Sequence, residues 1–326
     1  MKGFSLLIRG LLLLLVAVTL NSCIDYNSLD TDELEILYKK KKDPAILPVL
    51  CKKYYKKYQE EYLKEDYIRN FQNEYKMKTI HYCRLSYEKT GNTESAKVLE
   101  RLYLSNYVNL HKDFLYFLYW AHKAGDTEVI DTFLTNDALI FATLEHTDVL
   151  LLYLTKDMRD LLDDEVIHRF EVARKMFQIY IKNLQKVKNS WLFFTNKDYI
   201  QEYFVELEKA FGQLIQDMKK NKYIINEVRR NFSLYYYNNL SGIKDHRTRA
   251  YLRIIENLKA LIRVNIDDFY IFLGRKESLS KEISTAMNIQ DEDKIILEDL
   301  SPIIKRFIEE KNKYLKEYNK LFNEVK

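Results

Sequence analysis

The chain has 326 residues, of which 47% are hydrophobic and 31% are charged, so it can bury a sizeable core and is not of the disordered class. A formal net charge of +4 gives no electrostatic reason to expect a polyanionic partner. Only seven glycines and three prolines are present, which excludes the many tight turns of a sheet protein and favours long helices. We therefore expect an all-α fold.

The first 22 residues have the organisation of an export signal. Lys2 and Arg9 precede the apolar run LLLLLVAVTL of residues 11–20. This run is shorter than the roughly 20 apolar residues that cross a bilayer, and Arg9 prevents its extension towards Phe4. Residues 1–22 therefore predict a cleaved signal peptide and not a membrane span.

The signal ends in Leu20-Asn21-Ser22-Cys23, which resembles the lipobox of bacterial lipoproteins, with Asn21 as the one departure. Relaxed motifs of this kind are similar to those of spirochaete lipoproteins. The resemblance covers about the first 23 residues. It implies cleavage before Cys23 and attachment of acyl chains such as palmitate to its sulfur and its new amino group. Each buried methylene contributes about 0.8 kcal/mol, so several chains hold a soluble body on a membrane. An ordinary signal peptide, with Cys23 as an incidental thiol, is the alternative.

After the lipidated Cys23, the polar stretch to residue 32 predicts a short tether. The densest charge run of the chain, Lys39–Lys42, follows soon after. It has two interpretations: contact with anionic lipid headgroups beside the anchor, or the solvated end of a helix, whose dipole lysines complement. The helix end is the simpler explanation.

The next stretch interleaves lysines with tyrosines, a pattern that can stack on nucleic acid. Its members are Lys52, Lys53, Lys56 and Lys57 with Tyr54, Tyr55 and Tyr58. Export excludes a nucleic-acid partner, which leaves an acidic glycan, a protein, or the ordinary structural interpretation of a half-buried helix edged by lysine stems.

Two further cysteines, Cys51 and Cys83, lie among apolar positions of helical segments. Exported proteins meet oxidising conditions, and two cysteines allow one disulfide. Buried thiols in a helical core are the other interpretation, and the pattern leaves the pairing open.

Residues 33–160 predict helical hairpins. The stretches KTGNTESA (89–96) and KAGDTEVI (123–130) match, and Gly91 and Gly125 are 34 residues apart. Each glycine can end a helix in the left-handed conformation, and Asn92 or Asp126 can cap the next one. This spacing is weakly similar to that of tetratricopeptide repeats, although only two copies are plain and the usual proline is absent. Two unrelated hairpins with the same turn chemistry are the alternative.

Residues 161–326 predict a bundle of four to six long helices. Apolar residues recur at steps of three and four in several stretches, which is the pattern of one buried helix face. The members are Val166, Phe170, Ala173, Phe177, Ile181 and Leu184; Ile200, Phe204, Leu207, Phe211, Leu214 and Met218; Tyr251, Ile255, Leu258 and Ile262; and Ile304, Phe307, Ile308, Leu315, Tyr318, Phe322 and Val325. Thr195 or Asn196 and Asp245 are expected caps, and Ser301-Pro302 predicts the start of the last helix.

No catalytic or cofactor-binding motif is recognisable. The six histidines (His81, His111, His122, His146, His168 and His246) form no metal-ligand pattern with each other or with cysteine. Asp291-Glu292-Asp293 lacks the glycine and glutamate of a calcium loop. Asp163-Asp164-Glu165 and Asp267-Asp268 could supply paired carboxylates for acid–base chemistry. The first group lies where a helix should start and is better explained as a cap and dipole partner. We expect no catalytic residue, metal or cofactor.

The expected function is that of a non-enzymatic, lipid-anchored extracytoplasmic protein that binds a macromolecular partner. The resemblance to helical surface lipoproteins of spirochaetes implies a host-ligand or adhesive role, at the outer membrane or cell surface rather than the inner membrane. The alternative is a periplasmic helical-repeat scaffold for envelope assembly. A hydrolase that uses carboxylates distant in the sequence is a third class.

Overall fold

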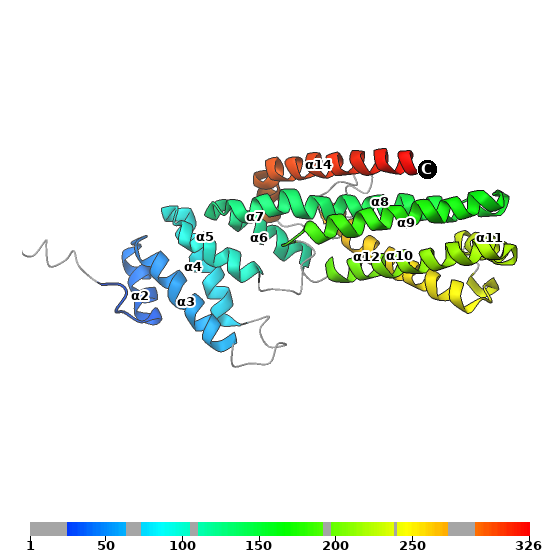
Figure 1. Cartoon of the computed structure of the whole chain (residues 1–326). Helices are drawn as coiled ribbons and strands as arrows, with labels where there is room; N and C mark the ends of the chain where they lie inside the picture. Colours follow the sequence, from blue (N-terminus) through cyan, green and yellow to red (C-terminus); the bar gives the residue numbers. More distant parts are fainter. Residues whose placement is uncertain (1–24, 63–72, 105–109, 192–196, 238–239, 273–290) are drawn as a thin grey trace, which may run out of the picture. The chain divides into compact units, whose positions relative to one another are not determined.

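A computed structural model describes residues 25–62, 73–104, 110–191, 197–237, 240–272 and 291–326 of the chain. Throughout these residues the secondary structure is helical and no strand is present, so the predicted all-α fold is confirmed (Figure 1). The signal peptide, Cys23 and the caps expected at Thr195 or Asn196 lie outside the described residues.

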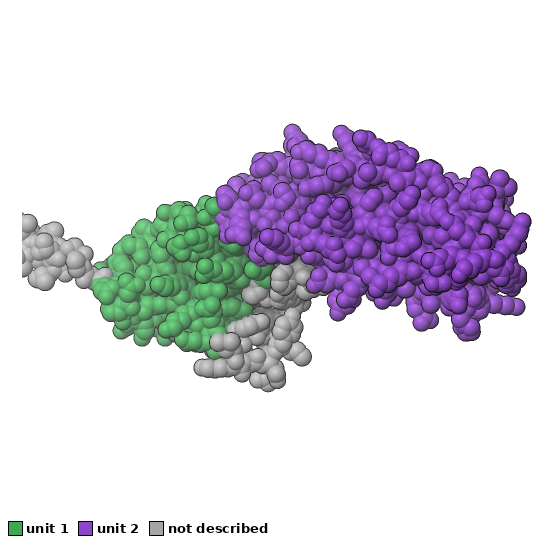
Figure 2. Space-filling model, in the orientation of Figure 1, with its two compact units in different colours: residues 1–105, 123–125 green, residues 106–122, 126–326 purple. Residues whose placement is uncertain are grey.

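The chain divides into two compact units, residues 1–105 with 123–125 and residues 106–122 with 126–326 (Figure 2). The first contains α2 (Thr31–Lys41), α3 (Ile46–Tyr62), α4 (Glu74–Thr90) and α5 (Thr93–Leu104). The second contains most of α6 (Leu110–Ala124), then α7 (Thr127–Thr132), the π-helical segment η3 (Phe133–Asp137), α8 (Ala138–Thr155), η4 (Met158–Asp160), α9 (Asp163–Lys186), α10 (Lys197–Lys220), α11 (Lys222–Tyr236), η5 (Leu240–Gly242), α12 (His246–Phe272) and α14 (Asp291–Val325).

The boundary expected between residues 160 and 161 falls inside the second unit. α8 and α9, on either side of that position, pack against each other, and both contact α14. Because these helices share one core, the acidic turn before α9 is a connection within a unit.

The core of the first unit is joined by a disulfide between Cys51 of α3 and Cys83 of α4, both of them buried. Around it, apolar and aromatic side chains form one cluster, whose buried members are Leu34, Ile46, Leu47, Leu50, Tyr54 and Tyr82. The disulfide settles the pairing that the sequence left open. It joins two helices that also meet through aromatic contacts and hydrogen bonds.

The residues before α2 are folded onto this core. The side chains of Tyr26 and Leu29 pack against the apolar cluster, and the hydroxyl of Tyr26 donates to Asp43 at 2.6 Å. Asp30 accepts from the backbone of Glu33 and completes a capping box, so α2 begins at Thr31. From Asp25 on, the expected tether is therefore a packed segment, because its half-buried Tyr26 and Leu29 contact the apolar cluster.

Both predicted glycine turns are confirmed. Gly91 and Gly125 have φ of +65° and +74°, in the left-handed region that favours glycine. Asn92 accepts from the backbone of Ser95 at 2.8 Å, and Asp126 caps α7 in the same way. α4 packs along α5, as expected of a hairpin.

After the second turn the two copies differ. α7, η3 and α8 follow each other without a break, so the helical stretch extends from Thr127 to Thr155. That stretch is much longer than the second helix of a short repeat. The helices around the two turns belong to different units, and stacking of the hairpins stays a prediction.

The stretch Thr127–Thr155 is long and apolar enough, by length and composition, to cross a membrane, and no other helix among the described residues is. However, 67% of its most apolar window is buried inside the protein. α8 contacts α9, α11, α12 and α14 (Figure 1). It is the core helix of the second unit.

The predicted stripes of α9, α10 and α12 form the buried faces of these helices, with Ile181 and Tyr251 half-buried at their edges. Asp245 accepts from the backbone of Thr248 at 2.7 Å and caps α12, as predicted.

The predicted start of the last helix was wrong, because Pro302 lies inside α14. Proline removes one backbone hydrogen bond, which usually ends or bends a helix. Here the neighbouring Leu300, Ile303 and Phe307 are buried, and the ring of Phe307 contacts Phe133 and Phe141. These contacts hold the helix on both sides of the proline.

Candidate functional site

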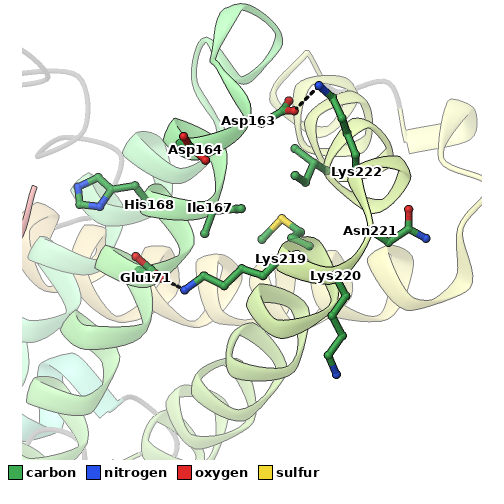
Figure 3. A pocket seen from close by; sticks show the side chains of 11 residues that line it. Asp163, Asp164, Ile167, His168, Glu171, Lys219, Lys220, Asn221 and Lys222 are labelled. Carbon is green, nitrogen blue, oxygen red and sulfur yellow. Dashed lines mark hydrogen bonds and ion pairs between the residues drawn. The ribbon is translucent and has the colours of Figure 1, made fainter.

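An open recess of about 640 Å³ lies in the second unit where α9 begins and α10 turns into α11 (Figure 3). Charged residues of both signs surround an apolar floor. The lining residues are Asp163, Asp164, Ile167, His168, Glu171, Met218, Lys219, Lys220, Asn221, Lys222 and Ile225. The recess is the candidate binding site of the described chain.

Helix-end chemistry places these charges together. The first turn of α9 is acidic, which complements the positive end of the helix dipole, and Glu165 accepts from the backbone of Leu162 at 2.7 Å. The last turn of α10 carries Lys219 and Lys220, which complement the negative end. Because an acidic helix start lies beside a basic helix end, the recess collects both signs of charge.

Ion pairs cross the recess. Asp163 contacts Arg229 at 2.6 Å and Lys222 at 3.0 Å, and these hydrogen bonds hold the pKa of its carboxyl below the usual value. Lys219 reaches from α10 to Glu171 of α9, with the two charged atoms 2.6 Å apart (Figure 3). The lysines of the pairs Lys219–Glu171 and Lys222–Asp163 are exposed, and exposed ion pairs contribute little stability. They can be exchanged for contacts with a partner at small cost.

The remaining groups are available to a ligand. Asp164 and Lys220 are exposed and make no polar contact within the described residues. His168 is exposed and shares a hydrogen bond of 2.8 Å with the backbone oxygen of Lys326. Met218 and Ile225 are buried beneath these polar groups and form the floor.

The recess offers charged and apolar contacts to a bound segment. The described lining includes no serine, threonine or cysteine that an adjacent base would activate. An apolar floor with a mixed-charge rim fits the side chains of a protein segment, and the recess is too open to enclose a small molecule.

The acidic groups singled out in the sequence are described only in part. Asp163, Asp164 and Glu165 occupy the first turn of α9, as their helix-end interpretation predicts. The side chains of Asp267, Asp268 and Asp291–Asp293 lie outside the described residues.

The histidines are dispersed. His168 lines the recess and His146 is buried in the core of the second unit, whereas His81, His122 and His246 are exposed on separate helices. The side chain of His111 lies outside the described residues. Within the described part of the chain, no three His, Cys, Asp or Glu side chains gather to hold a metal ion.

The lysine–tyrosine stretch of α3 turns its aromatic rings inward. Tyr54 is 1% exposed, its ring stacks on Tyr82 with centroids 5.5 Å apart, and its hydroxyl donates to Glu35 at 2.5 Å. Burial and the neighbouring Glu35 raise the pKa of Tyr54 to about 12. Tyr58 is also buried. The half-buried helix is the correct interpretation, and the rings of Tyr54 and Tyr58 are not available for stacking on a partner.

The run Lys39–Lys42 forms the last turn of α2 and its C-cap, as the helix-end interpretation predicts. Lys42 itself has a φ of 54°, which is uncommon for a residue with a side chain. All four lysines are exposed.

The recess residues of α10 and α11 were missed in the sequence. Lys219 and Lys220 signal a helix end, but nothing local indicates that this end meets the start of α9. The pair formed by Arg229 and Asp163 joins residues 66 positions apart and follows only from the fold.

No protein-family model, curated protein or solved structure matches the chain, so the assignment of a function rests on its own residues.

Proposed function

We propose that the protein is a non-enzymatic, lipid-anchored helical protein that is exported to the cell envelope and binds a macromolecular partner there. Acyl chains on Cys23 provide the anchor, at the outer membrane or cell surface, and the recess between α9, α10 and α11 contacts the partner. The role is host-ligand binding or adhesion. Nucleic acid is not the expected partner.

The observation that carries export is the buried disulfide between Cys51 and Cys83 in a chain that starts with a signal-like segment. Disulfides persist in oxidising compartments and are rare in the cytosol. The signal and the lipobox-like motif are independent of the disulfide, and both favour the same side of the membrane. With two of the three cysteines paired, Cys23 is the one left for lipid attachment.

The recess supports the binding role. Its rim carries exchangeable ion pairs and the free charges of Asp164 and Lys220, and its floor is apolar. Protein–protein contacts combine such features, an apolar centre with a polar and charged rim.

Protease treatment of intact cells tests surface display. The host-ligand role requires that added protease degrades the protein while a periplasmic marker stays intact. Full protection of the protein in intact cells, with degradation after the outer membrane is opened, contradicts this role and favours the periplasmic alternative.

Charge reversal in the recess tests the binding site. The double variant Asp164→Lys/Lys220→Glu preserves net charge and disturbs no described intramolecular pair. Its matched control is Asp198→Lys/Lys209→Glu, which exchanges two exposed charges beside a separate recess on α10. A ligand that wild-type protein retains from host or envelope extracts should be lost by the recess variant and kept by the control. Equal retention by both variants contradicts a role of the recess.

A periplasmic helical-repeat scaffold is the second candidate, and the matched turns favour it. Tyr82 and Tyr116, which occupy equivalent positions before the two glycines, are both buried, and so are Leu99 and Phe133 after them. A structure of the intact protein in which these two hairpins do not stack in parallel would exclude a repeat array.

A further inference from the structure

The folded body begins almost directly at the expected lipidation site. Asp25 is the first described residue, and only Ile24 separates it from Cys23. Two extended residues span about 7 Å at most. Because Tyr26 and Leu29 are packed on the first unit, no long tether separates an acyl chain on Cys23 from the surface of that unit.

The contacts of this segment show which part of the unit is close to Cys23. α2 and α3 are antiparallel neighbours, since Thr31 meets Lys57 while Glu35 meets Tyr54. Tyr26 donates to Asp43 at 2.6 Å, in the connection between the two helices. The chain just after Cys23 therefore lies at the end of the hairpin where α2 finishes.

That end carries the run Lys39–Lys42, whose four side chains are exposed. Asp25 and Asp43 lie at the same end, which leaves an excess of two positive charges. The acidic residues at the start of α2, Asp32 and Glu33, precede these lysines by six to ten residues, which is about 9–15 Å at 1.5 Å per residue. This separation exceeds the screening length of about 8 Å at physiological salt, so those carboxylates do not cancel the lysines.

Glu35, the acidic residue of α2 that is closest to the lysine run, makes its shorter contacts with other residues. Glu35 accepts from Tyr54 and lies 3.2 Å from Lys78 of α4, whereas its distance to Lys39 is 3.9 Å. Glu35 thus turns towards the core of the unit, and the lysine run keeps its charge on the surface.

We propose that the end of the α2–α3 hairpin formed by Lys39–Lys42 is a membrane-binding surface, which rests on anionic lipid headgroups when Cys23 carries its acyl chains. This inference rests on the proposed lipid anchor. The lipid anchor and the lysine run then act together. The acyl chains hold the first unit at the bilayer, and the short link between Cys23 and that unit keeps the lysines within reach of the headgroups. The partner is a lipid surface rich in acidic headgroups.

Chemical lipidation of the mature chain tests the surface directly. In residues 23–326 with the disulfide formed, Cys23 is the one free thiol, so a maleimide that carries a single saturated chain can be attached there alone. A single acyl chain gives only marginal membrane binding, so the electrostatic contribution of the lysines to binding stays measurable. Partition is measured on phosphatidylcholine vesicles with and without phosphatidylglycerol, at low and high salt.

Each lysine near an anionic surface strengthens binding about fivefold, the equivalent of about 1 kcal/mol. Phosphatidylglycerol should therefore increase the partition of the wild type by a factor on the order of 30, an advantage that high salt removes. The triple variant Lys39→Gln/Lys40→Gln/Lys41→Gln should bind acidic vesicles about 100-fold more weakly than the wild type. Its matched control, Lys305→Gln/Lys316→Gln/Lys320→Gln on α14, removes the same charge and should keep the preference. Equal binding of the wild type to both vesicles, or an equal loss in both variants, overturns the proposal.

The short link has its own test. A flexible Gly/Ser insertion of a dozen residues between Ile24 and Asp25 lowers the effective concentration of the lysines at the surface. The preference for acidic vesicles should fall severalfold while binding to neutral vesicles stays constant. An unchanged preference overturns the role of the link.

Failure of this proposal and failure of the lipid anchor can be told apart. The vesicle assay uses a chain attached in vitro and does not depend on lipidation in the cell, which the mass of the cellular protein reports. Melting curves of the variants without vesicles show that the fold is retained.

Discussion

The two compact units are stabilised in different ways. In the first unit, the buried ring of Tyr54 stacks on that of Tyr82, the hydroxyl of Tyr54 contacts Glu35 and Lys78, and a disulfide joins two of the helices. The second is packed by phenylalanines from several helices, such as Phe177 against Phe204 and Phe211. A small unit buries a smaller share of its surface than a large one, so a covalent link adds a larger share of its stability.

The difference indicates which conditions and substitutions should destabilise each unit. The first unit depends on an oxidising environment and on charged partners for its tyrosines. The second depends on close packing and on keeping the buried His146 uncharged. Four predictions test this comparison.

The largest effect is expected from Phe307→Ala in α14. Its ring is fully buried, stacked on Phe133 at 4.4 Å between centroids and edge-on to Phe141 at 5.5 Å. Removal of a buried phenylalanine costs about 3–5 kcal/mol through lost burial and the remaining cavity. Denaturant unfolding should show this loss for the second unit only. A loss below about 1 kcal/mol contradicts the role of this contact in holding α14 across Pro302.

The double variant Cys51→Ala/Cys83→Ala should destabilise the first unit by about 2–4 kcal/mol, because the disulfide closes a loop of 32 residues and restricts the unfolded chain. Hydrogen exchange followed by mass spectrometry can assign the effect. We expect lost protection in α3 and α4 and unchanged protection in α9 and α10. Unchanged protection in α3 and α4 would show that packing alone stabilises this unit.

The second unit should instead lose stability in acid, through His146. Its ring is 1% exposed and lies among Tyr180, Tyr318 and Phe322; Nδ1 shares a hydrogen bond with the hydroxyl of Tyr180. Burial lowers the pKa of His146 from 6.5 to about 4, and a hydrogen bond with Asn319 opposes this only in part. Between pH 6.5 and 4 the unfolded chain therefore binds more protons than the folded one, and stability falls as the pH falls.

The loss amounts to roughly 3 kcal/mol at most, is absent above pH 6.5, and levels off below pH 4. The variant His146→Gln should flatten the pH dependence of unfolding, whereas His168→Gln, which removes an exposed histidine, should not. The same slope in both variants would assign the acid sensitivity to other groups.

The smallest effect concerns the cap of α2. Lys42 adopts a left-handed backbone conformation, which glycine accepts without strain. Lys42→Gly should therefore stabilise the first unit, by about 1 kcal/mol at most. The opposite change at Gly91, to alanine, meets no atom within 4 Å and should cost a similar amount from its φ alone. Melting temperatures that shift in the same direction for both variants contradict this account of the caps.

Sequence patterns predicted the features that depend on interactions between residues close in the sequence. The stripes of α9 and α10 and the caps at Asn92, Asp126 and Asp245 follow from periodicity and from side chains close in sequence. The start predicted at Pro302 failed because contacts between α14, η3 and α8 outweigh the local signal.

Properties that depend on distant residues were not predictable. The disulfide needed the antiparallel placement of α3 and α4, and the recess needed the end of α10 to meet the start of α9. The segment after Cys23 looked like a tether because it is polar, yet Tyr26 and Leu29 suffice to fold it against the first unit. Without the fold, two apolar side chains in a short polar segment are weak evidence that the segment is packed.

The most direct test of the central claim is the intact mass of the protein purified from its own cells. We predict a chain that starts at Cys23, carries acyl chains, and gains two hydrogens on reduction because Cys51 and Cys83 are joined. A mass that matches the unprocessed chain from Met1, or a chain that starts at or near Cys23 without lipid, would contradict the account.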